Sequence, residues 1–134
     1  MILYHFTSPH HVEGCLREGL RLGHIPADVA RGRRGLIPGY QWLTTNPEFA
    51  QSWCEYSSLP YDRAAYRITV DVPKEAEADA LVWTEVCQRL APKGWRILNE
   101  FGDPDNWRLF RGIVRPEWMG EVLHKRGHVF RRAS

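Results

Sequence analysis

The chain opens with a short apolar segment that contains one histidine. Residues 2–6 read ILYHF and predict a strand, with His5 close to its end. Ser8 and Pro9 follow, and this pair is typical of a helix N-cap and a first helical position. The predicted helix closes at Gly19, because apolar or small residues recur at helical spacing up to that point: Val12, Cys15, Leu16, Gly19 and Leu20.

A second strand followed by a helix start repeats this design. Residues 40–45, YQWLTT, predict a strand, and Asn46-Pro47 predicts a helix that carries Phe49, Trp53 and Cys54. Two helix N-termini then follow two strand ends. Free backbone N–H groups at such termini favour anions such as phosphate.

The second half of the chain is richer in strands than in helices. Residues 64–72 alternate and end at Pro73, and a helix at about 78–91 buries Trp83, Val86, Cys87 and Leu90. Strand patterns also cover 107–114 and, after a turn at Arg115-Pro116, the segments EVLHK and HVFRR. This order favours an α+β fold, one small mixed domain over residues 1–134, over a doubly wound parallel sheet.

The segment between the first two strands, residues 21–39, is rich in glycine and proline. We expect an irregular loop here, and a loop of about twenty residues in a compact domain often binds a ligand or partner. Arg31, Arg33 and Arg34 would face that ligand. A basic surface loop with no ligand is the alternative, and the sequence leaves both open.

Composition limits the classes of protein. With 134 residues and a formal net charge of +2, the chain lacks the dense basic footprint of a dedicated nucleic-acid binder. Three cysteines without C-x-x-C spacing predict neither a disulfide framework nor a zinc site, and no metal is expected. No window has the length and hydrophobicity of a membrane span, so we expect a cytoplasmic protein without a membrane partner.

Common catalytic motifs are absent, and the aromatic residues are the remaining signal. The sequence has no P-loop, no G-x-G-x-x-G and no G-x-S-x-G. It has six tryptophans, of which Trp42 and Trp53 are eleven positions apart. They either pack in the core or form two walls around a flat heteroaromatic ligand, which His5 and Thr7 would orient.

At these residues the chain resembles the ADP-ribosyltransferase superfamily. YHFTSPHHVEGCLREGL is similar to its opening motif, and GYQWLTTNPEFAQSWCEY is similar to its aromatic strand and following helix. The resemblance implies split antiparallel sheets with flanking helices, and NAD as co-substrate. It also implies His5 at the ribose hydroxyls of NAD and Trp42 and Trp53 on either side of nicotinamide, with Thr7 and Thr44 flanking them.

A third block, DNWRLFRGIVRPEWMGEV, resembles the strand that begins with the family's catalytic glutamate. The chain departs from the family here, because the matching position is Asp105 or Asn106. A carboxylate there would stabilise the oxocarbenium-like centre that forms when the nicotinamide–ribose bond breaks. Aspartate reaches about 1.5 Å less far than glutamate, and asparagine supplies no charge.

Three functions follow from the resemblance. The leading one is an NAD-dependent mono-ADP-ribosyltransferase, of glycosyltransferase class, that modifies a macromolecule and acts as a toxin or anti-host effector. The second is an RNA 2′-phosphotransferase-like or other nucleic-acid-modifying NAD enzyme, whose phosphate contacts would be Arg31, Arg33, Arg34 or Arg111. The third is a catalytically inactive binding or inhibitory module of the same fold. The sequence indicates neither the acceptor nor the oligomeric state.

Overall fold

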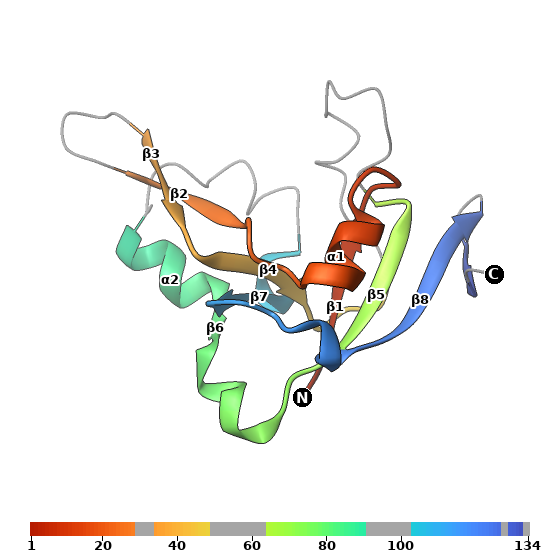
Figure 1. Ribbon diagram of the computed structural model, residues 1–134. Coiled ribbons are helices and arrows are strands. Elements are labelled where there is room, and N and C mark those ends of the chain that lie inside the picture. Colours follow the sequence, from red (N-terminus) through yellow and green to blue (C-terminus); the bar gives the residue numbers. More distant parts are fainter. Residues whose placement is uncertain (29–33, 49–63, 91–102, 127–128, 133–134) are drawn as a thin grey trace.

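Strands dominate the computed structural model of the chain (Figure 1). It describes residues 1–28, 34–48, 64–90, 103–126 and 129–132. Over these residues the protein is a small α+β domain with one large antiparallel sheet, one two-stranded sheet and few helices. The predicted α+β class is confirmed at this level.

The large sheet has seven strands in the described part of the chain, in the order β6-β7-β4-β1-β5-β8-β9, and every pairing is antiparallel. The predicted strands over 2–6, 40–45, 64–72 and 107–114, and the two C-terminal strands, are therefore confirmed within a few residues. The bounds are β1 Ile2–Thr7, β4 Tyr40–Thr44, β5 Tyr66–Asp71, β6 Ala80–Val82, β7 Trp107–Arg111, β8 Met119–Arg126 and β9 Val129–Arg132.

The second sheet occupies most of the segment that we expected to be an irregular loop. Strands β2 (His24–Asp28) and β3 (Arg34–Pro38) pair along their whole lengths. The loop prediction is wrong because Pro26 and Pro38 weaken a strand pattern without forbidding it. In a two-stranded ladder each strand has an open edge, where a missing N–H is tolerated.

Two α-helices are described, α1 (Val12–Glu18) and α2 (Trp83–Leu90). The predicted start of α1 at Pro9 is wrong. His11 is the N-cap, and the Ser8 carbonyl, rather than its hydroxyl, accepts hydrogen bonds from the N–H groups of His11 and Val12 at 3.1 Å each. Helix α2 is also shorter than predicted, because the residues before it form a 3-10 helix, η3 (Lys74–Asp79), and strand β6. No helix among the described residues has the length and hydrophobicity to cross a membrane.

Hydrophobic side chains form one cluster on each face of the large sheet. In Figure 1, α1 lies in front of β1 and β5, and α2 lies beside β6 and β7. We name the two faces after these helices. The α1 face carries Leu3, Val12, Leu20, Leu43, Ile68, Val70, Val72, Phe110 and Val114. The α2 face carries Ile25, Trp83, Val86, Cys87, Trp107 and Leu109, so the predicted packing role of Cys87 is confirmed.

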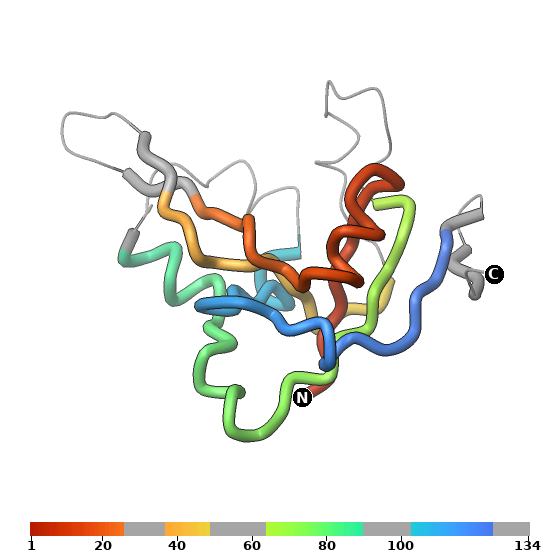
Figure 2. The backbone as a smooth tube through the Cα atoms, in the orientation of Figure 1, coloured from red at the N-terminus to blue at the C-terminus, as the bar shows by residue number. Residues whose placement is uncertain are grey.

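The turn after α1 is fixed against the segment that follows β7 (Figure 2). Leu20 and Val114 exchange two backbone hydrogen bonds of 2.9 and 3.0 Å. Gly19 lies directly before this bridge with a φ of +82°, and a Cβ atom there would collide with the Val114 carbonyl. The close approach of the two segments therefore requires a glycine.

This requirement predicts opposite effects for two glycine substitutions. Gly19→Ala should lower the free energy of unfolding by about 2 kcal/mol or more, since both the backbone conformation and the contact oppose a Cβ. Gly14→Ala, in α1 with no atom within 4 Å of the added Cβ, should raise it by roughly 0.5–1 kcal/mol. Urea unfolding of both variants tests this, and equal effects would contradict the close approach.

Candidate functional site

His5 lies inside β1, two residues before the strand ends at Thr7. In the antiparallel register His5 pairs with Ile68 and Leu3 pairs with Val70. Residues that lie directly opposite each other share a face, and both partners belong to the buried cluster of the α1 face. The imidazole therefore projects from the α1 face, where it is partly buried.

One hydrogen bond fixes the orientation of the His5 ring. Its Nδ1 lies 2.8 Å from the backbone carbonyl oxygen of Trp42 on β4. Burial lowers the pKa of His5 below its ordinary value of 6.5, and the bond to the Trp42 carbonyl opposes this shift only in part. The folded protein therefore favours the neutral imidazole.

Thr7 lies on the same face as His5, because residues two apart on a strand point the same way. It is 6% exposed, and its hydroxyl hydrogen-bonds to the Cys15 sulfur on α1. Burial raises the pKa of the Cys15 thiol despite this contact. His5, Thr7 and Cys15 thus form a small group without a fixed charge at neutral pH.

Trp42 points away from this group. It pairs with Leu109, which belongs to the α2 face, and its ring lies 4.9 Å from that of Trp83 and 5.6 Å from that of Trp107. The indole Nε1 donates a hydrogen bond of 3.1 Å to the His24 carbonyl oxygen. The structure therefore joins His5 to the backbone of Trp42 but places the two rings on opposite faces of the sheet.

The other residues expected to bind the cofactor or phosphate are dispersed. Thr44 is 4% exposed, and its hydroxyl accepts a hydrogen bond from the Asn46 N–H. Arg111 ends β7 in an exposed ion pair, with its Nη2 2.9 Å from Asp79 Oδ1. Arg34 begins β3. Trp53, Arg31 and Arg33 lie outside the described residues.

Asp105 and Asn106, expected at the catalytic position, belong to a short 3-10 turn, η4 (Pro104–Asn106). Asp105 is exposed, and its backbone carbonyl accepts a hydrogen bond from Arg108. The Asn106 amide donates to both carboxylate oxygens of Asp103 at 2.9 and 3.1 Å and accepts from the Thr45 hydroxyl at 2.7 Å. Its side chain thus stabilises the turn.

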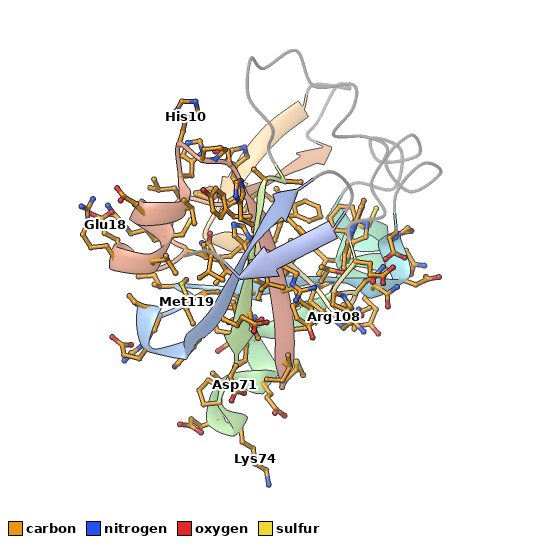
Figure 3. All side chains as sticks on the ribbon, turned by 90° about the vertical axis from the view of Figure 1, so that its right-hand side faces the viewer. His10, Glu18, Asp71, Lys74, Arg108 and Met119 are labelled. Carbon is orange, nitrogen blue, oxygen red and sulfur yellow. The ribbon has the colours of Figure 1, made fainter. Side chains whose placement is uncertain are left out.

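This turn does not lie beside His5. Strand β4 separates β7 from β1, so the two outer strands are about 10 Å apart. Figure 3 shows Arg108, which is bonded to the turn, across the molecule from His10 and Glu18 at the two ends of α1. Asp105 and Asn106 are therefore two strands away from the histidine that they were expected to assist.

Two polar arrangements were missed from the sequence. Gln41 is 3% exposed, accepts from the Gly23 N–H at 2.8 Å and donates to the Gly112 carbonyl at 3.1 Å, which ties β4 to two loops. Its position as the polar residue in YQWLT was the available signal. Asp103, which also accepts from Asn46 at 3.0 Å, gave no comparable signal. Within the described ranges no cluster of three metal-ligating side chains occurs.

Comparisons with known proteins add no relative to this geometry. A scan against protein-family models, a search of curated proteins and a search of solved structures each found no match. A functional proposal therefore depends on the residues and contacts described above.

The lowered pKa of His5 predicts an acid-sensitive contribution to stability. Below pH 6.5 the unfolded chain takes up a proton that folded His5 resists, so stability is lost as the pH falls towards the folded pKa. The slope is at most about 1.4 kcal/mol per pH unit. In His5→Asn, which keeps an N–H towards the Trp42 carbonyl, urea unfolding at about pH 7.5 and 5.5 should show a smaller loss. An unchanged loss would contradict the assignment.

The contacts of Asn106 predict a structural role. Asn106→Asp replaces an N–H donor with a carboxylate facing Asp103, and should lower the free energy of unfolding at pH 7 by about 1–3 kcal/mol. Asp105→Asn, one residue away but exposed, should change it by less than about 0.5 kcal/mol. Urea unfolding of both variants measures this. A stable Asn106→Asp protein would contradict the structural role.

Proposed function

We propose that the chain binds NAD and is an ADP-ribosyltransferase of glycosyltransferase class with a macromolecular acceptor, acting in the cytoplasm as a toxin or effector. One observation carries the proposal. The strands that hold the three motif blocks, β1, β4 and β7, lie side by side in the sheet, and His5 is bonded to Trp42 across the first two. The finer fold that goes with the proposal is the split-sheet arrangement of this superfamily.

The described residues fit one end of NAD better than the other. On the α1 face, His5 and Thr7 offer hydrogen-bonding groups next to each other, which suits ribose hydroxyls. When bound, NAD supplies the glycosidic bond whose cleavage releases nicotinamide. The stacking role of Trp42 has less support, because its ring packs on Trp83 and Trp107. That role rests on the resemblance alone.

A second candidate is favoured by the turn at the start of β7. Asn106 is engaged by Thr45 and Asp103, and exposed Asp105 is two strands from His5. No carboxylate side chain of the described residues contributes to the charge balance of His5. These facts favour a binding module of the same fold that holds NAD, or a partner, without breaking the glycosidic bond.

One experiment separates the two candidates. Calorimetric titration with NAD measures binding, and incubation with labelled NAD and cell lysate measures nicotinamide release and label transfer. The transferase predicts binding, release and transfer, all reduced at least about tenfold by His5→Ala and unchanged by His24→Ala, an exposed histidine on β2.

The other outcomes are equally definite. Binding without release supports the inactive module. No binding by the parent protein would overturn both candidates as NAD proteins, provided that a thermal melt shows the protein to be folded.

A further inference from the structure

The protonation state of His5 can be assigned from its hydrogen bond. A backbone carbonyl oxygen only accepts, so the Nδ1 atom 2.8 Å from the Trp42 oxygen must carry the hydrogen. In a neutral imidazole one nitrogen donates and the other accepts. The remaining nitrogen, Nε2, is then an acceptor, and it has no hydrogen-bond partner among the described residues.

The surroundings of the ring keep it uncharged. Ile68, its partner on β5, and Leu3, two residues earlier on β1, are both fully buried. Helix α1 contributes the Cys15 thiol, which is held protonated by burial, and β4 contributes Leu43 on the same face. None of these groups supplies a negative charge that would stabilise an imidazolium.

We propose that His5 is a fixed neutral acceptor, with hydrogen on Nδ1 and a lone pair on Nε2, which selects a ligand group that donates a hydrogen bond and rejects phosphate. The tautomer is a property of the free protein. The selection among ligands rests on the proposed NAD site.

This assignment sets the chemical class of group that binds at His5. A hydroxyl or amide donates to a neutral Nε2, whereas a phosphate or carboxylate oxygen presents lone pairs to a lone pair. An anion would have to protonate the ring first, against the cost of burying the charge. The arrangement therefore favours a sugar hydroxyl over the 2′-phosphate of an RNA substrate.

Nitrogen-detected NMR of histidine-labelled protein tests the tautomer. The His5 signals are identified by their loss in His5→Asn. We expect a protonated Nδ1 and an unprotonated Nε2 at neutral pH. A protonated Nε2, or a doubly protonated ring, would overturn the assignment.

Titrations of the same sample test the selection. NAD should move the Nε2 signal without protonating it, and inorganic phosphate should leave it in place. Protonation of the ring by phosphate would overturn the selection. If NAD moves no signal while the tautomer is as assigned, the proposed NAD function fails and the tautomer stands, so the two failures are distinguishable.

Two substitutions separate the donor from the acceptor. Asparagine at position 5 places its amide near Nδ1 and keeps the bond to Trp42, whereas glutamine reaches towards Nε2. His5→Asn should keep the stability of the parent at neutral pH and weaken NAD binding about tenfold, the value of one neutral hydrogen bond. His5→Gln should bind NAD more tightly than His5→Asn, and the same changes at His24 serve as controls. Full affinity in His5→Asn would overturn the acceptor role.

Discussion

Strand β1 lies at the centre of the large sheet, hydrogen-bonded to β4 on one side and to β5 on the other. Its register decides on which face each candidate residue lies. Because side chains alternate along a strand, a shift of one residue would exchange His5 with Tyr4 or Phe6. Buried Leu3 and Ile68 oppose such a shift, since it would move apolar side chains out of their cluster. The hydrophobic core thus also fixes the position of His5.

The same register gives the two faces different roles. On the α2 face, Trp42, Trp83 and Trp107 pack together beneath α2 and form much of its core. The α1 face carries His5 and Thr7, which have hydrogen-bonding groups and little fixed charge. The bond from His5 to the Trp42 carbonyl crosses between adjacent strands and connects the two motif blocks through the backbone. An uncharged, oriented acceptor on a rigid strand suits recognition of a polar, neutral ligand group.

Local patterns in the sequence predicted much of the fold. The alternation in β5 and the apolar segment of β1 were sufficient, as was the spacing of Trp83, Val86 and Cys87 in α2. Strands β2 and β3 were missed because glycine and proline masked their pairing. The site was less predictable. The face on which Trp42 lies depends on strand register, and the role of Asn106 depends on Thr45, which is 61 residues away. Neither contact leaves a pattern within a short window of sequence.

The central claim is that a neutral ligand group binds at His5 on the α1 face while Trp42 remains part of the core of the α2 face. A crystal structure of the chain with NAD tests it most directly. We predict a ribose hydroxyl within hydrogen-bond distance of Nε2, with Nδ1 still bonded to the Trp42 carbonyl and the three tryptophan rings in contact. NAD stacked against Trp42 on the α2 face, with His5 untouched, would contradict the account.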